Sequence, residues 1–247
     1  MFRDNYVPYT VTIDGTTLPG FFMIGGKHIF TSIEPSQDPY KACVEMQVED
    51  EHTMLLNSYY DEPTVRDKCQ AKGYYIPHDI MFTVLGLLAF YHGKPRIVLD
   101  DGSRKILSGC EWNLRIMNRL LHPEKSTFYE KFGFKAFNEI LQNPAGLRIS
   151  HLKPYLPDHS LVMKVMHTHN MKTLKQLVKY MYTRCNGDHY DMYKELEYEI
   201  IGALDARAKL IPNSRDNILY YKDVYPTHDM KIIRNRIIFT STVKKLK

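Results

Sequence analysis

The chain has 247 residues, 44% of them hydrophobic and 25% charged, with 33 Lys and Arg against 28 Asp and Glu. This length allows one large domain or two small ones, each with a buried core. No run approaches the length of an apolar membrane span, and the first residues lack the apolar stretch of a signal peptide. The sequence therefore predicts a cytoplasmic protein without a membrane partner.

Charge is distributed unevenly along the chain. Residues 1–150 carry 16 Lys and Arg against 18 Asp and Glu, whereas residues 151–247 carry 17 against 10, a net charge of +7. Turn-forming residues gather between positions 143 and 157. We therefore predict a domain boundary near residue 150, followed by a basic extension over residues 151–247.

The cysteines are scattered and form no Cys-x-x-Cys pair; they are Cys43, Cys69, Cys110 and Cys185. This spacing argues against a disulfide framework and predicts a reducing compartment. His167, His169, Cys185 and His189 could form a zinc site. Two histidines two positions apart on a helix point to different faces, so we predict no metal site.

Extended segments come first. Alternating apolar residues predict strands over residues 6–13, 20–33, 41–48 and 53–60, the second of them folded into a hairpin. Pro77 then suits the first turn of a helix, because its ring holds φ near the helical value and it lacks an N–H. Apolar residues at three and four spacing continue this buried helix until residues 92–95 end it.

A short strand over residues 96–99 follows, closed by an acidic turn at residues 100–103. We predict a second helix after this turn and an aromatic strand over residues 128–134. A helix, a strand and another helix imply a sheet covered by crossover helices.

Beyond residue 150 the pattern is helical. Ser160 is expected to cap a helix over residues 161–166 and Asn170 one over residues 171–184, and a third helix follows from Asp188. The apolar residues interleaved with Lys, Arg and Thr over residues 231–247 predict a closing strand or a basic tail. The predicted fold class is α+β, a mixed and mostly antiparallel sheet with crossover helices plus a helical C-terminal extension.

Two motifs resemble a known family. Residues 129–134, Tyr-Glu-Lys-Phe-Gly-Phe, are similar to a signature near the end of the GCN5-related N-acetyltransferase fold, in which the Tyr lies close to the sulfur of acetyl-CoA. The Asp-Asp-Gly-Ser turn at residues 100–103, followed by residues 125–131, resembles predicted acetyltransferases of large DNA viruses. The resemblance implies an acetyltransferase-like domain over residues 1–150, acetyl-CoA as co-substrate, and a place in the host cytoplasm or a virion.

The family binds the pyrophosphate of CoA in a Gln/Arg-x-x-Gly-x-Gly/Ala loop, where backbone N–H groups and a positive helix end attract phosphate. The resemblance places this loop at residues 70–75, with Gln70, Lys72, Gly73, Tyr74 and Tyr75 as candidate contacts. Tyr75 stands where Gly or Ala is expected. Either the loop binds phosphate in an altered geometry, or it is a bulky loop packed against the sheet.

Acetyl transfer needs a neutral amine, a polarised carbonyl and a protonated leaving thiol. The resemblance makes Tyr129 the candidate acid that protonates the thiolate; simple packing is the alternative. Asp100 and Asp101 follow a strand at its carboxyl end, where ligands gather in open sheets, and are candidate bases. Their alternative role is to form the turn and cap a helix. Glu45 and Glu49 are rival bases.

The expected function is therefore acetyl-CoA-dependent acetylation of an amine, with the acceptor left open among protein lysines, terminal amines and polyamines. The alternative is a catalytically inactive acetyltransferase-fold protein that serves in viral assembly or contacts nucleic acid. Lys and Arg interleaved with Tyr over residues 172–184 and 215–236 would suit a phosphate backbone with stacked bases.

Overall fold

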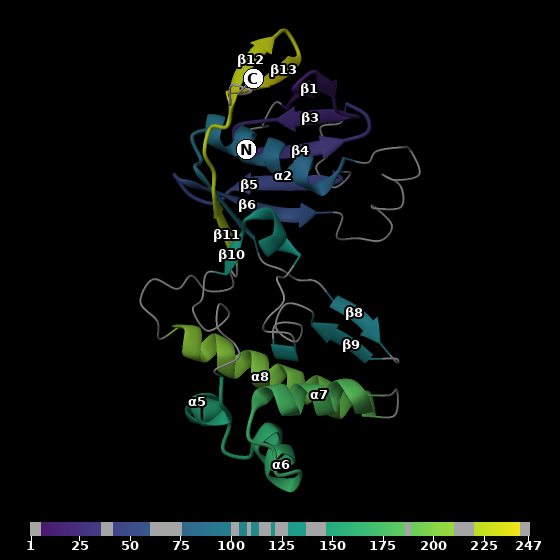
Figure 1. Cartoon of the computed structure of the whole chain (residues 1–247), viewed down its shortest axis with the longest axis vertical. Coiled ribbons are helices and arrows are strands. Elements are labelled where there is room, and N and C mark those ends of the chain that lie inside the picture. The colour runs from purple at the N-terminus through teal and green to yellow at the C-terminus, as the bar shows by residue number, and fades with distance from the viewer. Residues whose placement is uncertain are drawn as a thin grey trace, which may run out of the picture. The chain divides into compact units, whose positions relative to one another are not determined.

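The computed structural model describes residues 6–35, 42–59, 76–99, 104–107, 110–113, 120–121, 128–136, 147–185, 189–209 and 220–242. The chain forms two compact units, Met1–Leu99 with Tyr221–Lys247, and Asp100–Tyr220. The predicted boundary near residue 150 thus lies inside the second unit. The difference arises because strands near the C terminus pair with strands from the first hundred residues, as the yellow and purple arrows of Figure 1 show.

A mixed, mostly antiparallel sheet forms the first unit, as the sequence predicted. Its strands are β1 (Val7–Ile13), β2 (Thr16–Thr17), β3 (Phe21–Ile24), β4 (His28–Ser32), β5 (Val44–Val48), β6 (Thr53–Tyr59), β7 (Arg96–Leu99), β11 (Tyr220–Asp223), β12 (His228–Ile233) and β13 (Arg236–Ser241). The order across the sheet is β11-β7-β6-β5-β4-β3-β1-β13-β12, with β2 on β1. The β6–β7 and β1–β13 pairs are parallel, whereas β1–β3, β3–β4, β4–β5, β5–β6 and β12–β13 are antiparallel.

Helix α2 (His78–Tyr91) connects the parallel strands β6 and β7 and lies across one face of the sheet (Figure 1). It is the crossover helix that the sequence predicted. Pro77, expected at the first helical position, is instead the N-cap, with φ −51° and ψ 139°, so the helix begins one residue later than predicted. After the helix, Gly93 takes φ +77°, a left-handed value that a residue with a side chain rarely adopts. Four residues then suffice to reach β7.

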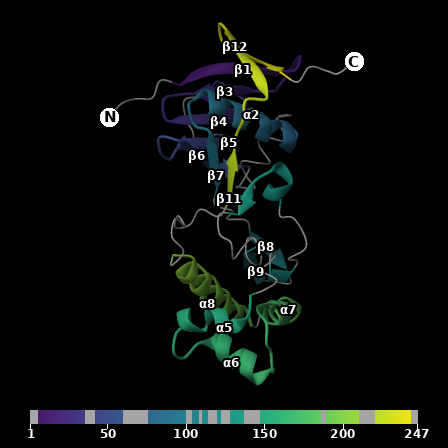
Figure 2. The ribbon, with the colours of Figure 1, turned by 60° about the vertical axis from the view of Figure 1, so that its left-hand side comes forward.

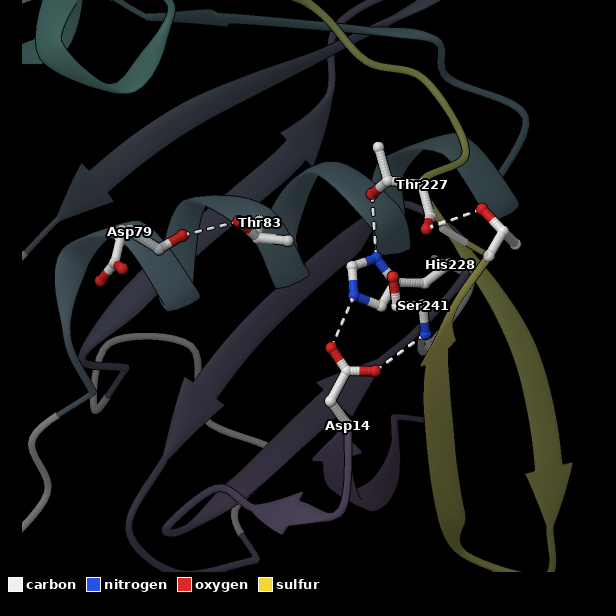
Figure 3. A network of polar contacts seen from close by, with 7 residues as sticks. Asp14, Asp79, Thr83, Thr227, His228 and Ser241 are labelled. Atoms are coloured by element: carbon white, nitrogen blue, oxygen red, sulfur yellow. Dashed lines mark hydrogen bonds and ion pairs between the residues drawn. The ribbon is translucent and has the colours of Figure 1, made fainter. Parts of the chain in front are cut away.

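The described part of the C-terminal segment forms a hairpin, β12–β13, which agrees with the expected closing strand. Polar contacts attach this hairpin to the rest of the first unit (Figure 3). Asp14, in the β1–β2 turn, accepts from the Ser241 backbone N–H at 2.8 Å through Oδ1, and its Oδ2 lies 3.2 Å from His228 Nε2. Tyr91 of α2 donates its hydroxyl to the His228 carbonyl at 2.8 Å. These contacts hold the hairpin against the first strands and the helix.

Helices dominate the second unit. Its elements are β8 (Arg104–Leu107), β9 (Cys110–Asn113), η2 (Tyr129–Phe132), β10 (Lys135–Ala136), α5 (Ile149–Leu152), η4 (Lys153–Tyr155), α6 (Leu161–Thr168), α7 (Leu174–Arg184) and α8 (Tyr190–Lys209). Both α5 and α6 pack on α8 (Figure 2). Its fully buried apolar side chains include Leu152, Val162, Leu174, Leu177, Val178, Met181, Leu196 and Ile200.

Three local predictions in this unit were wrong. The segment after the acidic turn is the hairpin β8–β9, paired from Arg104↔Asn113 to Leu107↔Cys110, where a helix was expected. The expected aromatic strand is the short 3-10 helix η2. Helix α7 begins after Thr173, which accepts from the Gln176 N–H in a capping box, and not after Asn170. A capping box pairs two backbone N–H groups at the start of the helix, whereas an Asn170 cap would have paired one.

The predicted absence of a disulfide framework was also wrong. Cys110 at the start of β9 is bonded to Cys185 at the end of α7, 75 positions later, and Cys43 is disulfide-bonded as well. Both Cys110 and Cys185 are buried. Disulfides persist in oxidising surroundings, so the bonded state does not agree with the reducing compartment expected from the spacing. Over the described ranges, no helix is long and apolar enough to cross a bilayer.

Gly86 allows α2 to approach the residue after β11. A Cβ built on Gly86 would lie 2.7 Å from Val224 Cγ1. Because Val is stiff at χ1, the helix or the strand would have to shift. We expect Gly86→Ala to lower the free energy of unfolding by about 1–3 kcal/mol. Urea denaturation of the purified variant measures the change.

The matched control is Gly202→Ala in α8, where a new Cβ meets nothing within 4 Å. That substitution should raise stability by up to about 1 kcal/mol, because Ala favours a helix interior over Gly. If both substitutions raised stability alike, the close approach at Val224 would be refuted.

Candidate functional site

One edge of the sheet in the first unit brings together the features expected of a ligand site. Strands β6 and β7 are parallel, with Thr53 beside Arg96 and Leu56 beside Leu99, so their carboxyl ends lie at the same edge. Ligands in open sheets bind outside such carboxyl ends. Strand β5, on the other side of β6, runs antiparallel, so the direction of the sheet changes here.

The amino end of α2 lies toward this edge. Its carboxyl end is held at the opposite edge, where His92 Nε2 lies 3.0 Å from the Gly25 carbonyl and Lys94 Nζ donates to the Asp50 carbonyl at 2.8 Å. Fourteen helical residues span about 21 Å, enough to cross the four-residue strand β7 completely. The first turn of α2, which begins at His78, therefore lies at the edge where β6 and β7 end.

Most of the residues predicted for the site lie outside the described residues. Gln70, Lys72, Gly73, Tyr74 and Tyr75 belong to the segment between β6 and α2, and no structure is assigned to them here. The same holds for Asp100 and Asp101. The structure does describe the residues that flank both segments. The first runs from the end of β6 to Ile76, which is fully buried, and the second begins directly after Leu99.

A bulge marks the end of β6. Glu45 of β5 pairs with Ser58, but the next residue, Met46, pairs with Leu56, so Asn57 is an extra residue on β6. In a bulge the extra residue is left out of the ladder, and bulges occur often beside active sites. Asn57 is exposed. The backbone of Asn57 is therefore a candidate polar contact that sequence patterning alone did not reveal.

The structure separates the two rival glutamates. Glu45 pairs with Ser58 near the carboxyl end of β6, at the candidate edge. Glu49 lies at the other edge, where its N–H donates to the Thr53 carbonyl at 3.0 Å in the turn before β6. Burial raises the pKa of Glu45, and the nearby His28 partly offsets this shift. Of the two glutamates, Glu45 is the one that lies at the candidate edge.

Tyr129 belongs to the second unit and is buried, with 8% of its surface exposed. Its ring centroid lies 5.1 Å from that of Phe128, 5.9 Å from Phe134 and 6.1 Å from Tyr220. Gly133 takes φ +84° after η2, the positive value for which a glycine was expected there. The Tyr129 ring thus serves in packing, whatever its hydroxyl does.

Helix α7 presents a basic face in the second unit. Lys175, Lys179 and Arg184 of α7 are exposed, as is Lys172 two residues before the helix; Tyr182 is 47% exposed, and residues 172–185 include no acidic residue. Arg184 lies over the Tyr180 ring at 4.9 Å. Lys175 and Lys179 are four positions apart, an arrangement of like charges that destabilises a helix slightly. This face is suited to an anionic partner.

Comparison of the chain with protein-family models, with curated proteins and with solved structures gave no match. Within the described part of the chain, no group of three or more His, Cys, Asp or Glu side chains could hold a metal ion. The Cys185 thiolate that a zinc site would have used is bonded to Cys110.

Proposed function

We propose that the protein is an acetyl-CoA-dependent N-acetyltransferase acting on an amine. One observation carries the proposal: the carboxyl ends of β6 and β7 and the amino end of α2 meet at one sheet edge. The segments of the predicted CoA loop and of the acidic turn are attached to those ends. Antiparallel strands followed by a helix-crossed parallel strand are also what the acetyltransferase resemblance requires.

Each part of the edge has a role in this proposal. The positive end of the α2 dipole, preceded in the chain by Gln70 and Gly73, attracts the pyrophosphate of CoA. The backbone of Asn57 is placed to polarise the thioester carbonyl, since a donor aimed at developing negative charge stabilises the transition state. The roles of Tyr129 as acid for the leaving thiolate and of Asp100 and Asp101 as contacts come from the resemblance alone, because these residues belong to the second unit.

Calorimetric titration of the purified chain with acetyl-CoA and with CoA tests the proposal. We expect micromolar binding of both, weakened at least tenfold in Gly73→Trp because a bulky side chain blocks the approach of phosphate to the backbone. The control is Gly202→Trp on the exposed side of α8, which should bind as the unaltered protein does. A folded protein that binds neither ligand contradicts the proposal.

The exposed basic face of α7 favours a second candidate, an acetyltransferase-fold protein that contacts single-stranded nucleic acid. Its cations would neutralise phosphates and its tyrosines would stack on bases. Lys175→Glu/Lys179→Glu should then weaken binding of a labelled oligonucleotide, measured by fluorescence anisotropy, far more than Lys27→Glu/Lys135→Glu, which changes the net charge equally. Equal weakening would indicate only nonspecific attraction.

A further inference from the structure

Strand β12 is the last strand at one end of the sheet in the first unit (Figure 1). It pairs with β13 along one side, from His228↔Ser241 to Ile233↔Arg236, and no described strand pairs with its other side. An edge strand carries a row of backbone N–H and C=O groups that are free to pair with another strand. The open side of β12 is therefore a surface on which a further strand can add.

The hydrogen-bond pattern shows which backbone groups of β12 face the open side. Just before the strand, the Thr227 carbonyl accepts from the Thr242 N–H at 3.0 Å. Opposed residues of an antiparallel ladder alternate between bonded and non-bonded pairs, so the odd-numbered residues of β12 bond to β13. The His228 carbonyl accordingly accepts from the Tyr91 hydroxyl and not from β13. The outward-facing groups belong to the even-numbered residues, which are His228, Met230 and Ile232.

Two opposite charges lie on one face of β12, at Asp229 and Lys231. Both side chains are exposed, and within the described residues neither has an ion-pair partner. Reversing the direction of Asp-Met-Lys gives Lys-Met-Asp. In an antiparallel pair of two β12 strands centred on Met230, Asp229 of each copy therefore lies directly opposite Lys231 of the other. Opposite charges in such positions stabilise a pair of strands.

Charge and hydrogen bonding together select this register. A shift by two residues places Lys231 opposite Lys231, or Asp229 opposite Asp229, and like charges directly opposed destabilise a strand pair. Parallel pairing in register also sets like charges side by side. A shift by one residue matches outward-facing backbone groups with groups that already bond to β13. The sequence of β12 is thus complementary to itself in the register centred on Met230.

Apolar side chains lie on the other face of β12. Met230 and Ile232 line a cavity of about 140 Å³ together with Leu88 of α2 and Ile237 of β13. The Ile232 side chain is 53% exposed. In the register centred on Met230, this residue lies opposite its own copy, and Ile232 lies diagonally across from it, within reach of a long side chain. Pairing of two copies therefore removes apolar surface from water as well.

We propose that the protein forms a twofold-symmetric dimer in which β12 pairs antiparallel with β12 of a second copy, centred on Met230. The pairing forms about six backbone hydrogen bonds and places an Asp229–Lys231 pair on each side of the axis. The His228 carbonyl keeps its bond to Tyr91, because a carbonyl oxygen has two lone pairs. Each copy presents the same strand to the other, so the assembly closes at the dimer. This dimer does not depend on the proposed acetyl transfer.

Sedimentation equilibrium of the purified chain tests the proposal. We expect a species of twice the 29.0 kDa of one chain, in micromolar equilibrium with the monomer, because a contact of this size is of the transient kind. Lys231→Asp should raise the Kd of the dimer at least about tenfold, since Asp229 then lies opposite an acid. The control is Lys27→Asp in the turn between β3 and β4, an exposed position with the same change of charge, which should leave the Kd unchanged.

Exchanging the two charges separates the strand pairing from a general effect of charge. Asp229→Lys should weaken the dimer as Lys231→Asp does, because Lys then lies opposite Lys. The double variant Asp229→Lys/Lys231→Asp restores opposite charges in the same register, and its Kd should return to within about threefold of the unaltered value. An equimolar mixture of the two single variants should form mixed dimers with similar affinity.

Disulfide crosslinking tests the register itself. Positions 229 and 231 of the two copies form non-hydrogen-bonded pairs, whose Cα atoms lie about 4.5 Å apart, within the span of a disulfide. A mixture of Asp229→Cys and Lys231→Cys chains should therefore form a covalent dimer under mild oxidation, and neither chain alone should do so. Non-reducing electrophoresis detects the product.

Three results would overturn the dimer. The first is a mass of 29.0 kDa for the unaltered chain at all concentrations up to about 100 μM. The second is a dimer whose Kd is the same in Lys231→Asp as in Lys27→Asp, because it would use another surface. The third is a double variant that has the circular dichroism spectrum of the unaltered protein and dimerises no better than the single variants.

Discussion

Replacing Cys110 and Cys185 by serine should lower the free energy of unfolding of the second unit by about 4 kcal/mol. The bond closes a loop of 75 positions between β9 and the end of α7, so its removal restores a large chain entropy to the unfolded state. Both cysteines are buried, and two serine hydroxyls in their place also lack the bond's apolar contacts. Urea denaturation of the double variant, followed by far-UV circular dichroism, measures the loss.

Reducing agent provides the control for this prediction. Dithiothreitol should destabilise the unaltered protein toward the level of the double serine variant, and it should affect that variant only through the bond of Cys43. Mass spectrometry after alkylation without reduction should find no modified Cys43, Cys110 or Cys185. Equal denaturation midpoints with and without reductant would contradict the account.

Glu199→Ala should lower the free energy of unfolding by about 2–4 kcal/mol, because this carboxylate of α8 accepts hydrogen bonds from donors at the start of α6. Glu199 Oε2 accepts from the Ser160 hydroxyl at 2.6 Å and from the Val162 N–H at 3.0 Å, and Oε1 accepts from the Leu161 N–H at 2.9 Å. The negative charge also lies at the positive end of the helix. Without it, partly buried donors lose their partner.

Two further variants show whether the hydrogen bonds are the cause. Glu199→Gln keeps one acceptor oxygen, so its free energy of unfolding should lie between those of Glu199→Ala and the unaltered protein. Glu195→Ala, on the exposed side of the same helix, should change the free energy of unfolding by no more than about 0.5 kcal/mol. A loss in Glu195→Ala as large as that in Glu199→Ala would contradict the specific role of Glu199.

Local patterns predicted elements well where one physical cause dominates. Pro77 and Gly93 delimit α2 because each restricts the backbone at its own position, and the alternation of residues 41–48 and 53–60 is visible within each strand. The sheet class followed from these elements. A hairpin at residues 20–33 was predictable for the same reason.

Features that depend on distant partners could not be predicted. The C-terminal strand β13 pairs with β1, more than two hundred residues earlier, so the unit boundary depends on a contact without local signature. The Cys110–Cys185 bond and the contact of Glu199 with α6 are of the same kind. Likewise, Glu45 could be ranked above Glu49 only after strand register showed which end of β6 each one faces.

The candidate site shows the same division. The acidic turn and the Gln70 to Tyr75 segment were found by resemblance, and the structure shows which elements they are attached to. The contact between Tyr6 and His28 has no local signature, because the two residues are 22 positions apart in the sequence.

The position of the proposed acetyl-CoA site can be measured directly by adding acetyl-CoA to ¹⁵N-labelled protein and following the backbone amide resonances. We expect the largest shifts for the amide resonances at the start of α2, from His78 to Ile80, and for those of Asn57 and Ser58, because these residues lie at the edge where β6 ends. Saturation at the concentration that calorimetry gives would tie the shifts to one site. Shifts confined to α7, or none at all, would contradict the account.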